Sequence, residues 1–266
     1  MRILFLGDVV GITGCLKIKS NLLGQIKKKK IDFVIVNAEN AAEEGVGLTE
    51  EICKDFFKSG VNVITTGNHV WDQKETIEHI ARENKLLRPE NLSILSPGKG
   101  FEIYNIPGGI KIGVLNLIGN IFMKKCDNVF ETAKNFLNKY KIKKDMDFLV
   151  VDFHGEITSE KMAMGHFFDG CATVVIGTHT HVPTNDCRIL ANGTAYLTDA
   201  GMCGDYNSVI GMNKINSLNR FLKKESQKHY PAEGAATLCG IIVECNILNG
   251  LANKVEKFIH GGELIK

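Results

Sequence analysis

The chain has 266 residues, 44% of them hydrophobic, and a formal net charge of +2 at pH 7. This length suits one large α/β domain or two small ones, with apolar residues enough for a full core. A charge so near zero gives no strong attraction to nucleic acid or a membrane surface, and no apolar run of about 18 residues exists to span a bilayer.

Strand and helix patterns alternate through the first two-thirds of the chain. Thr49 is an expected helix N-cap, because Glu50 and Glu51 follow it in a first turn that favours carboxylates, and Gly60 is a natural helix stop. Asp127 is the expected cap of a later helix. In chain order we expect strands at 3–6, 32–37, 61–65, 101–105, 110–117, 148–151 and 173–176, and helices at 15–29, 50–60, 73–81, 127–140 and 159–168.

The pattern changes after residue 187. Two strand pairs flank Asn-Gly turns, 187–190 with 195–198 and 235–247 with 252–260, and each pair predicts a hairpin. Alternating βα units followed by hairpins predict a mostly parallel layer plus an antiparallel layer. No linker-like or repetitive segment interrupts the chain, so we expect one domain over residues 1–266.

The eight cysteines contain no Cys-x-x-Cys pair, which disfavours a structural zinc knuckle. The apolar N-terminal run is short and is interrupted by Asp8, which favours a first strand over a signal peptide. We therefore expect free thiols in a reducing cytoplasm.

Polar side chains follow five of the expected strands directly. Carboxylates, amides and imidazoles placed at neighbouring strand ends converge, and such nitrogen and oxygen donors hold metal ions. The sequence therefore predicts a two-metal site. The five segments are Gly7-Asp8, Asn37–Asn40, Gly67–His69, Phe153–Gly155 and Gly177–His181.

Each segment alone has a plainer interpretation. The glycines that follow the first strand do not fit the Gly-x-Gly-x-x-Gly nucleotide pattern, but Asp8 alone could be a helix cap. Glu39 could belong to a polar turn, and a lone strand-end histidine such as His154 is more often structural. The remaining histidines have no such company and are expected to be structural: His79, His166, His229 and His260.

The pair His179 and His181 is the strongest single signal. Side chains two residues apart share a face of an extended segment, so both imidazoles can approach one metal pair. In the Gly67–His69 segment, glycine permits a sharp backbone turn, Asn68 offers an amide oxygen, and His69 can protonate a leaving oxygen. Asp72 is expected to orient this loop.

With these motifs the chain resembles the calcineurin-like metallophosphoesterases, and more narrowly their YmdB-like bacterial branch. The resemblance runs through GDVVG, NAEN, GNHVWD, DFHGEITSEK and GTHTHVPT. Val10 stands where the wider superfamily has the histidine of its Asp-x-His motif, and NAEN replaces its second motif. Cys15 stands where the branch usually has arginine. The resemblance implies an α/β fold, a sandwich of two mixed β-sheets flanked by helices (α/β/β/α).

The resemblance also implies the ligand sets. Glu39 would bridge the two metals, and His69 would be the general acid. The first metal would be held by Asp8, Glu39, Asn40 and His181, and the second by Glu39, Asn68, His154 and His179.

The implied activity is that of a dinuclear metal-dependent phosphodiesterase, which hydrolyses 2′,3′-cyclic nucleotides or related phosphodiesters through a metal-bridging hydroxide. Two divalent ions, two carboxylates and one hydroxide leave a net charge of about +1, which attracts a singly charged diester. The donor set suits iron, manganese or zinc, and the resemblance favours iron.

Two alternatives stay open: a phosphomonoesterase, and a metal-bound regulatory or RNA-interacting protein whose catalysis is incidental. The expected partner is a small-molecule phosphodiester, which includes RNA-derived ones. No membrane partner is expected, and a homo-oligomer is left open.

Overall fold

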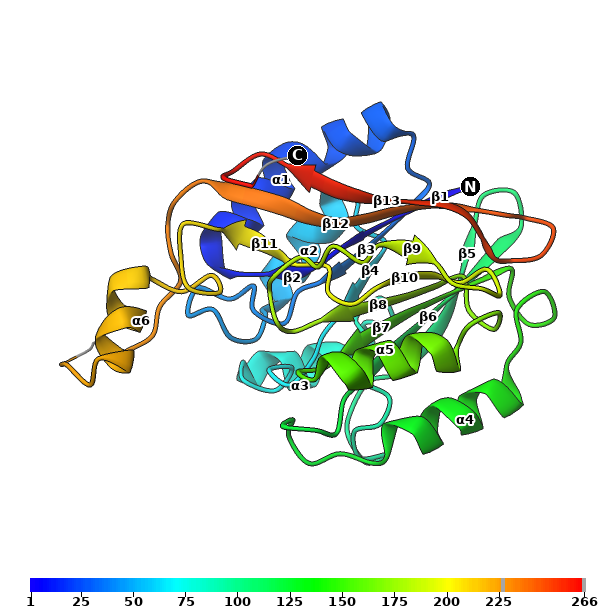
Figure 1. Ribbon diagram of the computed structural model, residues 1–266, viewed down its shortest axis with the longest axis horizontal. Helices are drawn as coiled ribbons and strands as arrows, with labels where there is room; N and C mark the ends of the chain where they lie inside the picture. Colours follow the sequence, from blue (N-terminus) through cyan, green and yellow to red (C-terminus); the bar gives the residue numbers. More distant parts are fainter. Residues whose placement is uncertain (226–227, 265–266) are drawn as a thin grey trace.

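Two mixed β-sheets pack face to face between layers of helices in the computed structural model, which describes residues 1–225 and 228–264 (Figure 1). The helices are α1 (Gly11–Lys29), α2 (Glu50–Lys58), α3 (Lys74–Arg82), α4 (Val129–Lys139), α5 (Thr158–Phe167) and α6 (Lys214–Phe221). The strands are β1 (Arg2–Leu6), β2 (Asp8–Val9), β3 (Phe33–Asn37), β4 (Val63–Thr65), β5 (Phe101–Ile106), β6 (Ile110–Ile118), β7 (Phe148–His154), β8 (Val174–Thr178), β9 (Arg188–Ile189), β10 (Ala195–Leu197), β11 (Met202–Asp205), β12 (Ala236–Cys245) and β13 (Ala252–His260).

The first sheet has the strand order β2-β11-β12-β1-β3-β4, with β13 also paired to β12. In it β1 runs parallel to β3 and antiparallel to β12. The second sheet has the order β5-β6-β7-β8-β10-β9, with a parallel centre and an antiparallel pair at each edge. The carboxyl ends of β1, β3 and β4 therefore share one edge of the first sheet, as those of β7 and β8 do in the second.

Three apolar layers hold the sandwich together. Leu4 of β1 packs with Ile18 of α1 and Phe56 of α2 on the outer face of the first sheet. Phe5, the next residue of β1, points the other way and packs between the sheets with Phe148 of β7. A third layer joins the second sheet to α4 and α5. Successive residues of β1 thus serve two different cores, as the period of two in a strand requires.

The predicted α/β/β/α sandwich is confirmed. The expected split into a parallel layer and an antiparallel layer is wrong, because the two C-terminal hairpins do not form a layer of their own. The hairpin of β12 and β13 joins the first sheet beside β1, and that of β9 and β10 joins the second beside β8.

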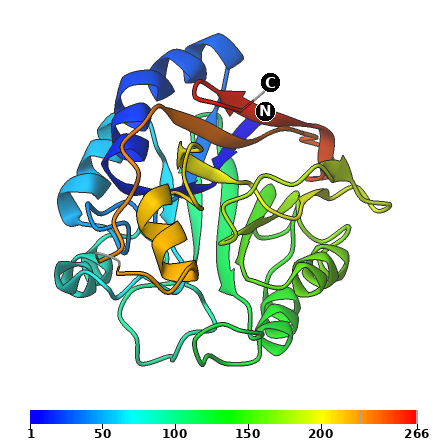
Figure 2. The same cartoon turned by 60° about the vertical axis from the view of Figure 1, so that its left-hand side comes forward.

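Most of the local signals proved right. Thr49 caps α2, and its hydroxyl accepts from the Ile52 amide at 3.2 Å. The cap of α4 is Asn128 and not Asp127, because the Asn128 side chain accepts from the Glu131 amide at 3.0 Å. No sequence pattern predicted β2, β11 or α6. Helix α6 lies apart from the layered body, in front of the sheets in Figure 2.

Cys15 lies in the outer core of the first sheet, where its thiol donates to the Ala41 carbonyl at 3.2 Å. Burial raises the pKa of this thiol to about 12. Cys15 therefore fills apolar space in α1. Within the described residues, no helix has both the length and the apolar character needed to cross a membrane.

Candidate metal centre

The eight residues predicted from the sequence come together where the strand ends of the two sheets meet. Asp8 begins β2, and Glu39 and Asn40 follow β3. The other five are Asn68 and His69 after β4, His154 at the end of β7, and His179 and His181 after β8.

His154 Nε2 is the centre of one group of donors. It lies 2.8 Å from Glu39 Oε1, 3.0 Å from His179 Nδ1 and 3.1 Å from Asn68 Oδ1. Glu39, His154 and His179 each offer a ligand atom, and these three atoms lie within 4.8 Å of one another. Glu39 and His154 are fully buried, so their charges are held away from water.

A buried chain of hydrogen bonds sets the orientation of the His154 ring. The Thr178 hydroxyl donates to Asp152 Oδ1 at 2.7 Å, so it can accept from the His154 Nδ1–H, which lies 2.9 Å away. Asp152 is fixed in turn by Asn37 Nδ2 at 2.9 Å and the Thr65 hydroxyl at 2.5 Å. With the proton at Nδ1, the lone pair of Nε2 points into the group of donors.

That lone pair then faces two further acceptors, the carboxylate of Glu39 and the amide oxygen of Asn68. Three acceptor atoms this close, with no proton between them, repel one another unless a cation lies among them. These residues therefore fit a metal ion.

The second group of donors lies around Asp8. Its Oδ1 atom is buried without a hydrogen-bond partner and lies 3.8 Å from His181 Nε2. The Oδ1 atom of Asn40 is also buried and unpartnered, while its Nδ2 donates to the Gly45 carbonyl at 2.8 Å. His181 Nδ1 donates to the Ile210 carbonyl at 2.8 Å, which leaves Nε2 for a ligand. Unsatisfied buried oxygens beside an imidazole lone pair also fit a cation.

The buried carboxylates of the centre favour a positive charge beside them. Burial lowers the pKa of His154, but the carboxylates of Glu39, Asp8 and Asp152 outweigh burial and raise it to about 9. Burial acts to raise the pKa of Glu39, but the imidazoles of His154, His179 and His69 hold it well below its usual range. A proton on His154 thus occupies the place of a metal ion, and the two compete.

Gly67 matters for a reason that differs from the sequence expectation. Its φ angle is not positive, so no sharp turn depends on it. A Cβ at this position would lie 2.3 Å from His154 Nε2 and 2.4 Å from Glu39 Oε2. Because Gly67 has no side chain, His154 and Glu39 can approach each other in the space that a Cβ would fill.

The sequence predicts an extended segment at His179 and His181, and this prediction is wrong. Both residues have positive φ angles, 99° and 64°. Asp199 Oδ2 holds Thr180 between them, accepting from its amide at 3.1 Å and its hydroxyl at 2.6 Å, and pairs with the buried Lys161 at 2.6 Å. This buried ion pair fixes a loop whose conformation few residues adopt unaided.

His69 lies on the open side of the centre and is partly exposed. Its backbone amide donates to Glu39 Oε2 at 3.0 Å, and its ring Nδ1 lies 2.6 Å from Asp72 Oδ2. Asp72 therefore orients the ring as well as the loop.

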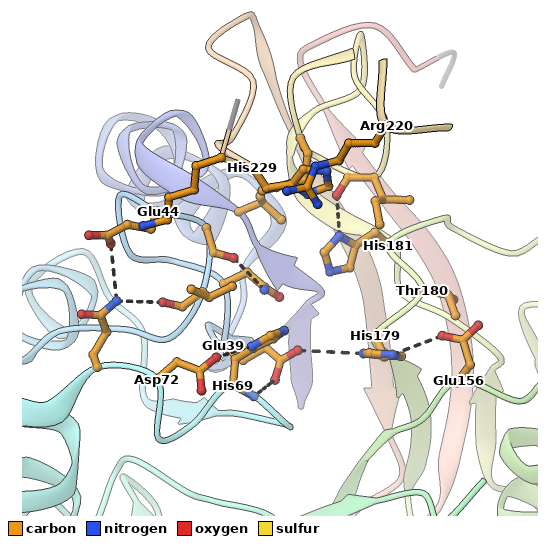
Figure 3. A pocket seen from close by; sticks show the side chains of 18 residues that line it. Glu39, Glu44, His69, Asp72, Glu156, His179, Thr180, His181, Arg220 and His229 are labelled. Atoms are coloured by element: carbon orange, nitrogen blue, oxygen red, sulfur yellow. Dashed lines mark hydrogen bonds and ion pairs between the residues drawn. The ribbon is translucent and has the colours of Figure 1, made fainter. Parts of the chain in front are cut away.

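A cleft of about 760 Å³ opens above these groups (Figure 3). Glu39, His69, His179 and His181 lie in its lining, while the fully buried Asp8 and His154 do not.

Sequence reasoning missed several residues at or beneath the cleft. Thr178 and Asp152 could have been found from the sequence, because both lie inside the motifs that supply histidines. Arg220 and His229 could not, because only the path of the chain around α6 brings them to the cleft. The expectation of a purely structural place for His229 did not foresee this position.

Known proteins resemble the chain over nearly its full length. A family model described as "YmdB-like protein" matches residues 4–258. A 2′,3′-cyclic-nucleotide 2′-phosphodiesterase of Bacillus subtilis (strain 168) is 41% identical over 259 residues, which are 97% of each chain.

Two solved structures share the fold. A protein from Thermus thermophilus has a TM-score of 0.91 and 36% identity, over 99% of this chain and 100% of that one. A novel phosphatase from Mycoplasma pneumoniae has a TM-score of 0.90 and 37% identity, over 98% of this chain and 93% of that one. With its donor residues at the seam between two mixed sheets, and with this likeness over almost every residue, the chain belongs to the YmdB-like protein family.

Proposed function

We propose that the protein is a metal-dependent phosphodiesterase that hydrolyses 2′,3′-cyclic nucleotides or related phosphodiesters. The observation that carries the proposal is the meeting of acceptor atoms at His154 Nε2, which a bound cation would satisfy. The B. subtilis relative is named for this class of substrate. Such a site favours hydrolysis at phosphorus, because phosphoryl oxygens are themselves ligands for hard cations.

We assign two metal ions to the two groups of donors. Glu39 belongs to both sets, since its two oxygens face different neighbours. The mixed nitrogen and oxygen donors suit iron first, with manganese or zinc as substitutes. Asp8, Glu39, Asn40 and His181 would hold the first ion, and Glu39, Asn68, His154 and His179 would hold the second.

Bound ions of this kind supply Lewis acidity toward a phosphoryl oxygen and lower the pKa of a water. The chain supplies the remaining functions. Buried Thr178 and Asp152 keep the His154 lone pair directed at the site. The deep position of Asp8 and His154 excludes bulk water from the floor of the cleft.

His69 is the proposed general acid. It lines the cleft beside Glu39, so it is placed to face the substrate. Asp72 accepts from the Nδ1–H of the ring, which fixes the ring orientation and leaves Nε2 to carry the proton that is transferred. That proton can pass to the oxygen that leaves phosphorus.

The test compares a diester with a monoester. Metal-loaded protein is assayed with 2′,3′-cyclic AMP, bis(p-nitrophenyl) phosphate and p-nitrophenyl phosphate, with metal content measured in every sample. We expect turnover of both diesters and a fall of about 10²–10⁴-fold in His69→Ala.

His166→Ala is the matched control, because His166 is exposed on α5 and does not line the cleft. It should keep full activity. Glu39→Gln should lose metal and turnover together, and a wild-type rate in that variant would refute the ligand assignment.

A phosphomonoesterase is the second candidate, because the M. pneumoniae neighbour is described as a phosphatase. The presence of just two carboxylates, Asp8 and Glu39, in the proposed ligand set argues for the diester. With two divalent ions and a hydroxide they leave a net charge of about +1, which matches a singly charged substrate. A monoester turned over faster than either diester would favour the phosphatase.

A further inference from the structure

The cleft has a cationic wall opposite its donors. Arg220 lies in the last turn of α6, and Lys228 and His229 follow that helix in the chain; all three line the cleft. Figure 3 shows Arg220 and His229 across the cleft from Glu39 and His69. A substrate held at the donors therefore extends toward positive charge.

The segment that carries these residues is fixed at its base. The Asn213 amide donates to the Tyr230 carbonyl at 3.0 Å, and the Ala232 amide donates to the Gly211 carbonyl at 2.8 Å. Nearer the cleft, Asn216 Nδ2 donates to the Lys228 carbonyl at 2.9 Å. The backbone of Lys228 is thereby tied to α6.

The side chains of Arg220 and Lys228 are unpaired within the described part of the chain, residues 1–225 and 228–264, where they make no ion pair or hydrogen bond. His229 Nε2 is buried and also lacks a hydrogen-bond partner. Burial and the charge of Arg220 both lower the pKa of His229. One carboxylate, that of Glu44, lies on the same side of the cleft, where it accepts from Gln73 Nε2 at 3.4 Å.

A second hollow of about 460 Å³ continues from this wall, since it shares Glu44, Lys228 and His229 with the cleft. Its lining includes Tyr230 and Ile12, both exposed, and three carboxylates, those of Glu43, Glu44 and Glu233. An aromatic and an aliphatic surface beside a cation are what a nucleoside base and its phosphate require.

We propose that Arg220 and Lys228 bind a second phosphate on the 5′ side of the nucleotide whose cyclic phosphate lies at the donors. This inference rests on the proposed function and names its substrate class: RNA fragments that end in a 2′,3′-cyclic phosphate. A 5′-phosphorylated mononucleotide carries the same phosphate chemistry, but the second hollow has room for the preceding nucleoside.

Three substrates separate these sources: adenosine 2′,3′-cyclic phosphate, its 5′-phosphorylated form, and the dinucleotide UpA with a 2′,3′-cyclic end. We expect kcat/KM to be about tenfold or more higher for the dinucleotide than for adenosine 2′,3′-cyclic phosphate, as one charge-assisted contact allows, mainly through KM. An equal gain for the 5′-phosphorylated mononucleotide would assign the gain to the phosphate alone. A ratio near one for both would overturn the proposal.

Arg220→Gln and Lys228→Gln should each reduce this ratio toward one. Lys224→Gln is the matched control, because it removes the same charge just after α6 from a side chain that does not line the cleft. A ratio that survives in both test variants, or that falls equally in the control, would contradict the subsite.

Binding gives an independent measurement. For UpA that carries a 3′-phosphate in place of the cyclic one, the slope of log Kd against log salt should become smaller when a phosphate contact is removed, because salt screens contacts between exposed charges. An unchanged slope in Arg220→Gln would count against the contact. If wild-type protein turns over none of the three substrates, the proposed function fails; if it turns over all three equally, the function stands and the subsite alone fails.

Discussion

Replacement of Lys161 by methionine should destabilise the protein by far more than the loss of a surface charge would. Lys161 is 2% exposed, and its partner Asp199 is fully buried, with 2.6 Å between Nζ and Oδ2. Methionine keeps the length and most of the packing of the side chain. It leaves the Asp199 carboxylate buried without a counter-ion, which costs about 3–5 kcal/mol.

The assay is thermal and urea unfolding of metal-free protein, followed by circular dichroism. For a chain of this size the loss corresponds to a Tm lower by roughly 6–20 °C. Lys99→Met is the control, since Lys99 is largely exposed in its pair with Glu102 and should cost about 0–1 kcal/mol. In the double variant Lys161→Met with Asp199→Asn, the lone charge is gone and most of the stability should return.

The reasoning would be refuted if Lys161→Met lost no more stability than Lys99→Met, or if the double variant were no better than the single one. Metal affinity gives a second readout, because Asp199 also holds Thr180 between two proposed ligands. We expect the double variant to regain stability without regaining full metal affinity.

Three further outcomes test the centre and the core. Thr178→Val removes the acceptor for His154 Nδ1–H and should weaken metal binding about 10–100-fold in a metal-buffered titration, with a wild-type Kd as the contrary result. Gly67→Ala places a methyl group within 2.4 Å of Glu39 Oε2 and should abolish metal uptake in elemental analysis, whereas Gly24→Ala, which meets nothing within 4 Å, should not. Burial raises the pKa of the five buried thiols, so at pH 8 a thiol reagent should modify no more than the three partly exposed cysteines until the protein is unfolded; modification of all eight in native protein would contradict this.

The sequence predicted best what local chemistry determines. The β1, β3 and β7 strands contain the buried apolar runs 3–6, 33–36 and 148–151, and such runs are visible without any tertiary information. The polar residues that end them were visible for the same reason. Their convergence follows because parallel neighbours end at one edge of a sheet.

What the sequence could not show depends on pairing and on chain path. Strand β2 has two residues, and β11 exists because β12 and β2 supply its hydrogen bonds. The two-sheet arrangement came from resemblance, since the hairpin patterns alone suggested a separate antiparallel layer. The ion pair of Lys161 and Asp199 joins residues far apart in the chain, and no local sequence pattern predicts it.

The seam between the sheets has a consequence for the order of events in folding. Asp8, Glu39 and Asn68 arrive with the first sheet, and His154 and His179 arrive with the second. Each sheet supplies only part of the proposed ligand set, so the complete site forms only after the two sheets have docked. The ion should therefore act late: it slows the unfolding of finished molecules and leaves the rate of folding nearly unchanged.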